Sequence, residues 1–248
     1  SEMYYVPQVS QMPAEEHPTK WVGDRSVEFI ESCDPTRPVF LFSSFIHPHP
    51  PFCPPAPWNK LYRTGDIPAP FVPDNAEDFV PLLHRNFSTE RLGISEKDAK
   101  RLKNFYYACV SFVDWQVGRI ISALKARGMY DDTLIIFSSD HGECLGDYAN
   151  MGKRTMLDCA ARVSMLMHIP GAAHSVRKAV CSLVDLAPTI LGWTGIPYDA
   201  GEFDGVNLLC ESHDYVFSQY DNKTNGAYMI AGAGEKLIYL ADIDRYYY

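Results

Sequence analysis

The sequence lacks the long apolar runs that form membrane-spanning helices. No segment approaches the roughly 20 apolar residues that a helix needs to cross a bilayer, so we expect no membrane span. Signal-peptide features, internal repeats and low-complexity segments are missing too. Hydrophobic residues nevertheless make up 46% of the 248 residues, which is enough for one large domain or a main domain with a small appendage.

Basic residues are scarce. The chain has 22 Lys and Arg residues against 31 Asp and Glu residues, which gives a net charge of −9. Proteins that bind nucleic acids by their phosphates need a basic face, so we expect no nucleic acid as a partner. A few basic side chains can still form a local pocket for a small anion.

The cysteines form no Cys-x-x-Cys pair, which excludes a zinc ribbon and a thioredoxin-like site. Their number is an odd seven and they are scattered along the chain. This pattern favours buried free thiols and a reducing compartment over a disulfide framework. A periplasmic or secreted location and a cytoplasmic one both stay open.

Apolar periodicity predicts an α/β fold with a mostly parallel sheet flanked by helices. Short apolar runs at 39–45, 133–139 and 163–169 are typical of strands covered on both faces. Between the first two lies a helix with a 3.6-residue period, which begins after the capping residue Ser95 and ends at Arg127-Gly128. Alternating strands and helices of this kind favour parallel pairing.

The rest of the chain predicts a smaller, strand-rich part. We expect a helix over 181–191 and strands over 215–219, 227–231 and 236–240, the last two joined as a hairpin. The predicted organisation is therefore an α/β core over residues 1–210, followed by the start of a C-terminal strand-rich subdomain over residues 211–248.

Two of the predicted strands end in unusual polar groups. His47-Pro48-His49 follows the first strand, and Asp140-His141-Gly142-Glu143 follows the second. In open α/β sheets ligands bind beyond the carboxyl ends of the strands. Asp140 and His141 offer an oxygen and a nitrogen ligand for a divalent cation. From these residues alone, a polar turn that ends the strand is the favoured interpretation, and a structural role is favoured for His49.

Several motifs, in this order along the chain, resemble the sulfatases of the alkaline-phosphatase superfamily. They are SFIHPHPPF, VGRIISALKARGMYDDT, FSSDHGECLGD, CSLVDLAPTIL and DGVNLL. The resemblance covers most of the chain from about Pro38 to Leu240. It implies part of an alkaline-phosphatase-like core.

The resemblance implies roles for particular residues. Asp140 and His141 match two ligands of a single divalent metal, usually Ca²⁺, with Mn²⁺ or Zn²⁺ as alternatives. His49 and Lys153 match residues that contact the sulfate ester, and the histidine is a candidate proton donor to the leaving oxygen. Tyr148 stands where the family often has histidine, which makes it a candidate substrate contact.

Family members use a formylglycine made from the first residue of a Cys/Ser-x-Pro-x-Arg motif. Residues 33–37, Cys-Asp-Pro-Thr-Arg, fit that motif. In the family the motif opens a helix, whereas here a proline and a predicted strand follow at once. We therefore predict that Cys33 is not the nucleophile. The chain resembles the middle and later part of a sulfatase, without the formylglycine and half of the metal ligands, and we expect it to be inactive by itself.

The resemblance implies a hydrolase of sulfuric esters, with a small molecule or a glycan sulfate ester as substrate. A phosphonate monoester or phosphodiester hydrolase of the same superfamily is one alternative. A non-catalytic binding protein is the other. The sequence does not identify the particular ester, because the variable loops that would select it carry no recognisable ligand motif.

Overall fold

The computed structural model describes residues 2–248, with side chains described from residue 4 onward. The chain divides into two compact units. Unit 1 consists of Ser1–Glu77, Phe87–Thr133 and Cys144–Met151. Unit 2 consists of Asp78–Asn86, Leu134–Glu143 and Gly152–Tyr248.

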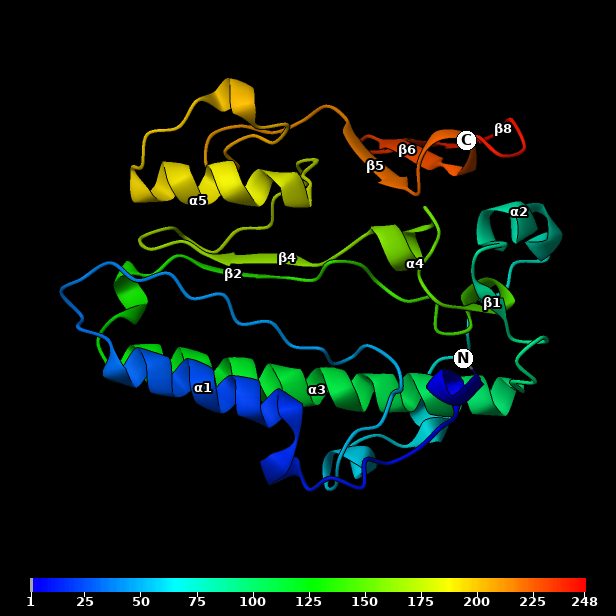
Figure 1. Cartoon of the computed structure of the whole chain (residues 1–248), viewed down its shortest axis with the longest axis horizontal. Coiled ribbons are helices and arrows are strands. Elements are labelled where there is room, and N and C mark those ends of the chain that lie inside the picture. The colour runs from blue at the N-terminus through cyan, green and yellow to red at the C-terminus, as the bar shows by residue number, and fades with distance from the viewer. Residues whose placement is uncertain (1) are drawn as a thin grey trace. The chain divides into compact units, whose positions relative to one another are not determined.

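Two helices that pack side by side dominate unit 1 (Figure 1). Helix α1 spans Pro18–Ser32 and helix α3 spans Glu96–Ala126. The predicted start of the second helix is confirmed: the Ser95 hydroxyl oxygen accepts a hydrogen bond from the backbone N–H of Asp98 at 3.1 Å. At its other end, Gly128 takes the left-handed conformation that ends helices (φ 66°).

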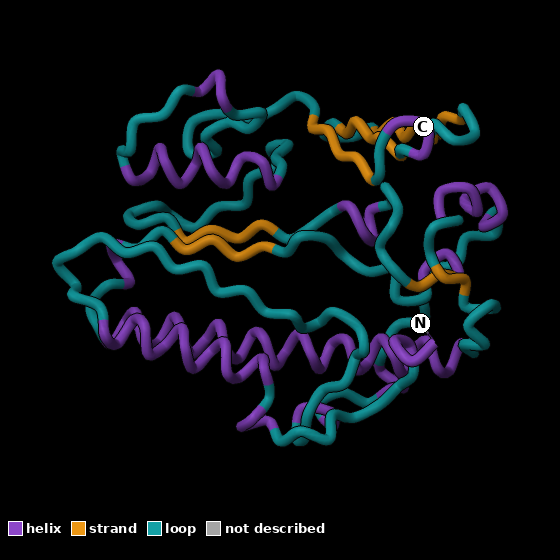
Figure 2. Tube along the Cα trace, viewed as in Figure 1, coloured by secondary structure: helices purple, strands orange, loops and turns teal. Residues whose placement is uncertain are grey.

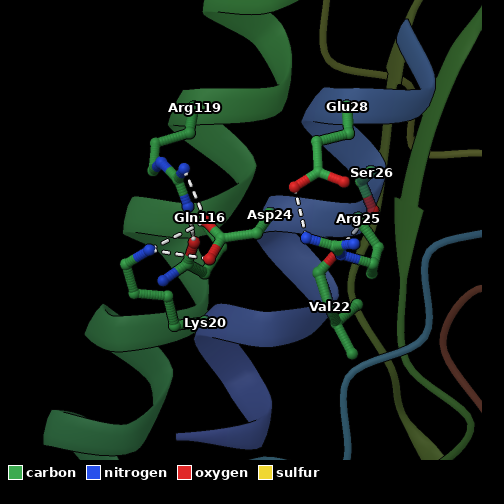
Figure 3. Close-up of polar contacts among 8 residues, drawn as sticks. All are labelled: Lys20, Val22, Asp24, Arg25, Ser26, Glu28, Gln116 and Arg119. Carbon is green, nitrogen blue, oxygen red and sulfur yellow. Dashed lines mark hydrogen bonds and ion pairs between the residues drawn. The ribbon is translucent and has the colours of Figure 1, made fainter. Parts of the chain in front are cut away.

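Polar contacts hold α1 against α3 (Figure 3). Asp24 on α1 accepts hydrogen bonds from Lys20 and forms an ion pair with Arg119 of α3, at 2.7 Å in each case. The two helices approach closely at Gly23, where a Cβ would lie 2.2 Å from Oε1 of the fully buried Gln116. Glycine is therefore the residue that this crossing requires.

The core of unit 1 is largely aromatic and aliphatic, and α3 supplies much of it. Its central cluster consists of Tyr5, Phe52, Leu102, Phe105, Leu145 and Met151. Two short strands, β1 (Phe87–Ser88) and β3 (Asn150–Met151), pair beside it in antiparallel fashion. The single-turn elements of this unit are η1 Glu2–Tyr5, η2 Ala14–Glu16, η3 Trp58–Lys60, η4 Thr64–Asp66, η6 Tyr130–Asp132 and η7 Asp147–Ala149.

The apolar run 39–45 forms no strand in the described chain, so that prediction was wrong. Its backbone is extended but joins no ladder, and Phe40 and Phe42 are 71% and 79% exposed. The predicted burial is not observed either, since no residue of 39–45 is buried. A strand exists only where a second strand supplies hydrogen-bond partners.

Unit 2 contains the ribbon formed by β2 (Ile135–Ser138) and β4 (Met165–His168), seen as paired strands in Figure 2. The two strands run antiparallel, with Phe137 opposite Leu166. The mostly parallel sheet is therefore not confirmed: every strand pair within residues 2–248 is antiparallel. The connection from β2 to β4 carries η7, β3 and the four-residue α4 (Asp158–Ala161), but no long crossover helix of the kind that usually joins parallel neighbours.

The predicted C-terminal strands are confirmed. They form an antiparallel sheet in the order β5-β6-β7-β8, with bounds Val216–Tyr220, Ala227–Ala231, Lys236–Leu240 and Arg245–Tyr247. The predicted helix over 181–191 is present as η8 (Leu183–Asp185) followed by α5 (Leu186–Thr194). The remaining elements of unit 2 are η5 Ala76–Phe79 at its border, α2 Val80–Leu83, η9 Ala200–Glu202 and η10 Lys223–Asn225. The expected domain boundary after residue 210 stays a prediction.

Among the described residues, no helix combines the length and the apolar character needed to cross a membrane.

Candidate active site

The turn after β2 brings Asp140 and His141 together. The Asp140 carboxylate accepts a hydrogen bond from the backbone N–H of His141 at 2.9 Å, and its other oxygen lies 3.3 Å from Nε2 of the same ring. His141 Nδ1 lies 2.9 Å from the carbonyl oxygen of Gly142. A carbonyl only accepts, so Nδ1 carries the proton and the lone pair of neutral His141 is on Nε2, beside the carboxylate.

Gly142 fixes this turn against α4. Its N–H donates to the carbonyl oxygen of Ala160 at 2.8 Å. A Cβ at this position would lie 2.1 Å from the carbonyl oxygen of Cys159, a distance that no side chain tolerates. The Asp-His-Gly sequence therefore has a packing reason for its glycine, in addition to any chemistry of its first two residues.

Lys153 lies on a loop that is held on both sides. The buried Glu143 carboxylate accepts a hydrogen bond from the N–H of Gly152, and Asn86 Oδ1 accepts one from the N–H of Arg154 at 2.8 Å. Within the described chain the Lys153 ammonium forms no hydrogen bond or ion pair. The loop is therefore fixed at its backbone, while the charged end of Lys153 stays available to an anion.

Glu143 and Asn86 are supporting residues that the sequence did not reveal. Glu143 joins the Asp140-His141 turn to the Lys153 loop across nine residues, and Asn86 reaches the same loop across 68. The only local signal was the glutamate directly after Gly142, in a position where a simple polar turn has no need for a buried carboxylate.

The donor atoms of Asp140 and His141 suit a divalent cation. Carboxylate oxygen suits Ca²⁺ and Mn²⁺, and imidazole nitrogen suits transition metals such as Zn²⁺. No group of three or more His, Cys, Asp or Glu residues within 2–248 is arranged to hold a metal ion. Asp140 and His141 thus fit a cation by the type of their donor atoms, as two candidate ligands of the several that such an ion takes.

His49 belongs to unit 1 and is exposed. Its backbone N–H donates to the carbonyl oxygen of Ile46 at 2.9 Å, and Nδ1 lies 2.7 Å from the carbonyl oxygen of Pro50. The carbonyl assigns the proton to Nδ1 and leaves Nε2 as the ring atom that can bind a ligand or exchange a proton.

Tyr148 also belongs to unit 1, in a left-handed conformation that non-glycine residues rarely adopt (φ 54°). Its N–H donates to the carbonyl oxygen of Phe71 at 2.7 Å, and the two rings meet edge to face with centroids 5.7 Å apart. The side-chain amide of Asn150 donates to its carbonyl oxygen at 2.8 Å. These contacts compensate for the unfavourable backbone conformation, which is typical of functional positions.

The structure therefore brings Asp140 and His141 into contact and joins Lys153 to their turn through Glu143. His49 and Tyr148 belong to unit 1, where each is held by its own hydrogen bonds.

Cys33, the cysteine of the motif over 33–37, caps the end of α1. Its N–H donates to the carbonyl oxygen of Ile30, and its own carbonyl oxygen accepts from Arg127 at 2.6 Å. No helix follows within 34–45. Cys33 therefore lies at the end of a helix, and the helix N-terminus that binds anions in motifs of this kind is absent there. The strand predicted to follow it is absent too.

A family model described as Sulfatase matches residues 2–196. An arylsulfatase of Clostridium perfringens is 32% identical over 82% of this chain and 44% of its own length. A choline-sulfatase of Rhizobium meliloti is 29% identical over 79% of this chain and 40% of its own length. A solved phosphonate monoester hydrolase of Silicibacter pomeroyi superimposes with a TM-score of 0.80 at 26% identity, over 97% of this chain and 57% of that one. The chain spans less than half the length of these two curated relatives.

Proposed function

Because the chain belongs to the sulfatase family, we propose that it contributes metal-binding and substrate-binding residues to an enzyme that hydrolyses sulfuric esters. The observation that carries this proposal is the linked pair of segments in unit 2: the Asp140-His141 turn and the Lys153 loop, joined by Glu143. A sulfuryl group carries negative charge on its outer oxygens. A cation and an ammonium group directed at those oxygens would stabilise such charge.

Asp140 and His141 would hold the divalent cation, which would supply positive charge to the ester oxygens. Ca²⁺ is the first candidate by family resemblance. The imidazole nitrogen beside the carboxylate favours Mn²⁺ or Zn²⁺, since Ca²⁺ takes oxygen ligands. Titration of the purified full-length enzyme, stripped of metal, with each of the three cations decides among them: the native ion restores activity at the lowest concentration.

Lys153 would bind a sulfate oxygen through its ammonium, and His49 would protonate the leaving oxygen. The tautomer of His49 supports this role, because a proton taken up at Nε2 gives an imidazolium that can donate it again. Tyr148 would contact the part of the substrate beyond the sulfate. The substrate is a small-molecule or glycan sulfate ester.

We place the nucleophile outside the 248 residues. Cys33 closes a helix and is hydrogen-bonded into the surface of unit 1, which argues against a formylglycine there. In the full-length enzyme, Cys33→Ala should leave kcat/KM for an aryl sulfate within about twofold of the wild type. Loss of activity in this variant, with the fold intact by circular dichroism, would make Cys33 the nucleophile. The 248-residue chain should show no hydrolysis.

A phosphonate monoester hydrolase is the second candidate, supported by the structural similarity to the enzyme of Silicibacter pomeroyi. The deciding experiment compares kcat/KM of the full-length enzyme for an aryl sulfate, choline sulfate and an aryl phosphonate monoester. The proposed function predicts that a sulfate ester is preferred by at least about tenfold. A clear preference for the phosphonate would replace it, and binding of sulfate esters without turnover would favour a non-catalytic binding protein.

A further inference from the structure

A buried histidine anchors the loop that carries His49. His47 is 8% exposed, and its Nδ1 lies 3.0 Å from the hydroxyl oxygen of Thr19. Its Nε2 lies 3.9 Å from the sulfur of Cys109 on α3. With the proton on Nε2, His47 accepts a hydrogen bond from the threonine and directs its N–H to the sulfur, so both ring nitrogens are satisfied in the neutral ring.

A second buried histidine packs on the first. The rings of His17 and His47 lie 4.6 Å apart between centroids, at an angle of 35°. His17 also caps α1, because its Nδ1 accepts a hydrogen bond from the N–H of Thr19 at 3.2 Å. Protonation of Nδ1 would remove this acceptor and place a charge against the other ring. Within the described chain, neither histidine has a carboxylate partner that would offset such a charge.

His49 lies between two buried anchors. His47 holds one end of the segment, and the fully buried Phe52 holds the other. The backbone N–H of His49 donates to the carbonyl oxygen of Ile46 and closes a turn that contains both His47 and His49. The exposed ring of His49 therefore lies on a short segment whose position depends on its two anchors. A small displacement of such a segment changes where a catalytic ring points.

We propose that His47 is a positioning residue: together with His17 and Thr19 it fixes the loop that presents His49, and it does so only while both imidazoles are uncharged. This inference rests on the proposed function for the role of His49, but the ordering of the loop does not. Acid would then release the loop, while the two helices behind it stay packed.

The charge states fit this proposal. Burial and, to a smaller extent, the neighbouring His17 together lower the pKa of His47 to about 4, and burial also lowers the pKa of His17. The other titratable groups packed at this point are the thiols of Cys109 on α3 and Cys53 on the same loop, whose pKa values burial raises. Because the pKa of His47 is lower in the fold than in the unfolded chain (6.5), the contribution of the neutral ring to stability is fully present above about pH 6.5. It decreases as the pH falls to about 4, where the folded ring takes up its proton and the anchor is lost.

The anchor also depends on α1 lying in place, since α1 carries both His17 and Thr19. The Asp24–Arg119 ion pair holds that helix on α3 (Figure 3). The Arg25–Glu28 ion pair lies on the same helix but joins no second element. Its removal is therefore a matched control for removal of the Asp24–Arg119 pair.

The test is an NMR titration of the ¹⁵N-labelled 248-residue chain between about pH 7.5 and about pH 3.5. It follows the histidine rings and the backbone amides of Ile46, His47, His49 and Phe52, because the prolines of this segment have no N–H. In the wild type these amides should broaden or shift as the pH approaches about 4, where the folded His47 ring takes up its proton. His47→Asn keeps an acceptor at the position of Nδ1 but takes up no proton. It should keep the loop ordered and remove most of the pH response, and the same change at the exposed His174 should alter nothing.

His47→Ala should leave the loop amides broadened even at about pH 7.5. Since this variant loses a buried ring, Thr19→Val provides a second test that keeps the volume and removes only the hydroxyl: hydrogen exchange of the loop amides should rise about threefold or more. Loop amides that match the wild type in both variants would overturn the proposal. So would an acid transition that persists unchanged in the His17→Asn/His47→Asn double variant.

Activity gives an independent readout in the full-length enzyme. His47→Ala should lower kcat at least about tenfold with KM nearly unchanged, and His47→Asn should restore kcat and flatten its acid limb. If the NMR response is present but no sulfate ester is hydrolysed, the anchor stands and the proposed function fails. If hydrolysis is present but the loop amides do not change in these variants, the proposed function stands and the anchor proposal fails.

Discussion

The two units support their candidate residues in different ways. In unit 1, His49 sits on a loop whose anchor is a ring, His47, buried against a second ring. In unit 2, Lys153 sits on a loop whose backbone N–H groups are held by the oxygens of Glu143 and Asn86. In unit 1 the support consists of two imidazole rings packed against each other. In unit 2 it consists of side-chain oxygens that accept hydrogen bonds from backbone N–H groups.

This difference determines what each support responds to. Neutral imidazoles buried without a carboxylate partner fail when they take up protons, so the loop of unit 1 should respond to pH. A buried carboxylate or amide oxygen that accepts from a backbone N–H fails when that one oxygen is removed, since the donor is then left unsatisfied. The predictions below test this contrast, from the largest expected effect to the smallest.

Gly142→Ala should destabilise the chain most, by about 3 kcal/mol, because its Cβ would meet the backbone of Cys159 at 2.1 Å. Urea unfolding at neutral pH measures the change. The matched control in unit 1 is Gly118→Ala, in the middle of α3 with no atom within 4 Å of the new Cβ. That variant should be more stable by about 0.5–1 kcal/mol. Equal effects at both glycines would show that the turn after β2 is not tightly packed.

Acid should cost the wild type about 3 kcal/mol of unfolding free energy between pH 6.5 and pH 4 through His47 alone. The sign follows from its lowered pKa: the unfolded chain binds the proton first, so stability falls as the pH falls. Urea unfolding at a series of pH values measures the slope. His47→Asn should remove most of this contribution, and an identical slope in that variant would contradict the buried neutral ring.

Glu143→Ala should increase hydrogen exchange at the amide of Gly152 and lower stability by about 1–3 kcal/mol, because a backbone donor loses its buried acceptor. Glu143→Gln keeps an acceptor oxygen and should retain most of the protection. Unchanged exchange in the alanine variant would mean that another group holds the Lys153 loop.

The smallest expected effect is at the α1–α3 contact. Arg119→Ala removes an ion pair between partly exposed groups and should cost about 0.5–1 kcal/mol. Arg25→Ala removes an exposed pair within one helix and should cost less than about 0.5 kcal/mol. Added salt should reduce the difference between the two variants.

Features with local causes could be predicted from the sequence. Helix α3 follows from its 3.6-residue period and the Ser95 cap, and the β6–β7 hairpin follows from alternation around glycines. The Asp140-His141 pair could be identified because the two residues are adjacent in the chain. The contact between their side chains then depends only on the local turn, which Gly142 allows.

The rest depends on contacts between distant residues. The apolar run 39–45 shows no sign of whether a partner strand exists, and strand direction depends on the connection rather than on the strand. Likewise His17 and His47 meet across 30 positions, and Asn86 reaches the Lys153 loop across 68, with no local pattern that marks either contact. These supports could be found only from the folded chain.

The most direct measurement of the central claim is kcat/KM of the full-length enzyme for an aryl sulfate after substitution of the unit 2 residues. Asp140→Ala and Lys153→Ala should each lower it by about 10³-fold or more, whereas Asp131→Ala, an exposed carboxylate in unit 1, should leave it unchanged. Metal content measured on the same samples should fall in the Asp140 variant and not in the Lys153 variant. Undiminished hydrolysis in Asp140→Ala would contradict the assignment of the turn after β2 as part of the active site.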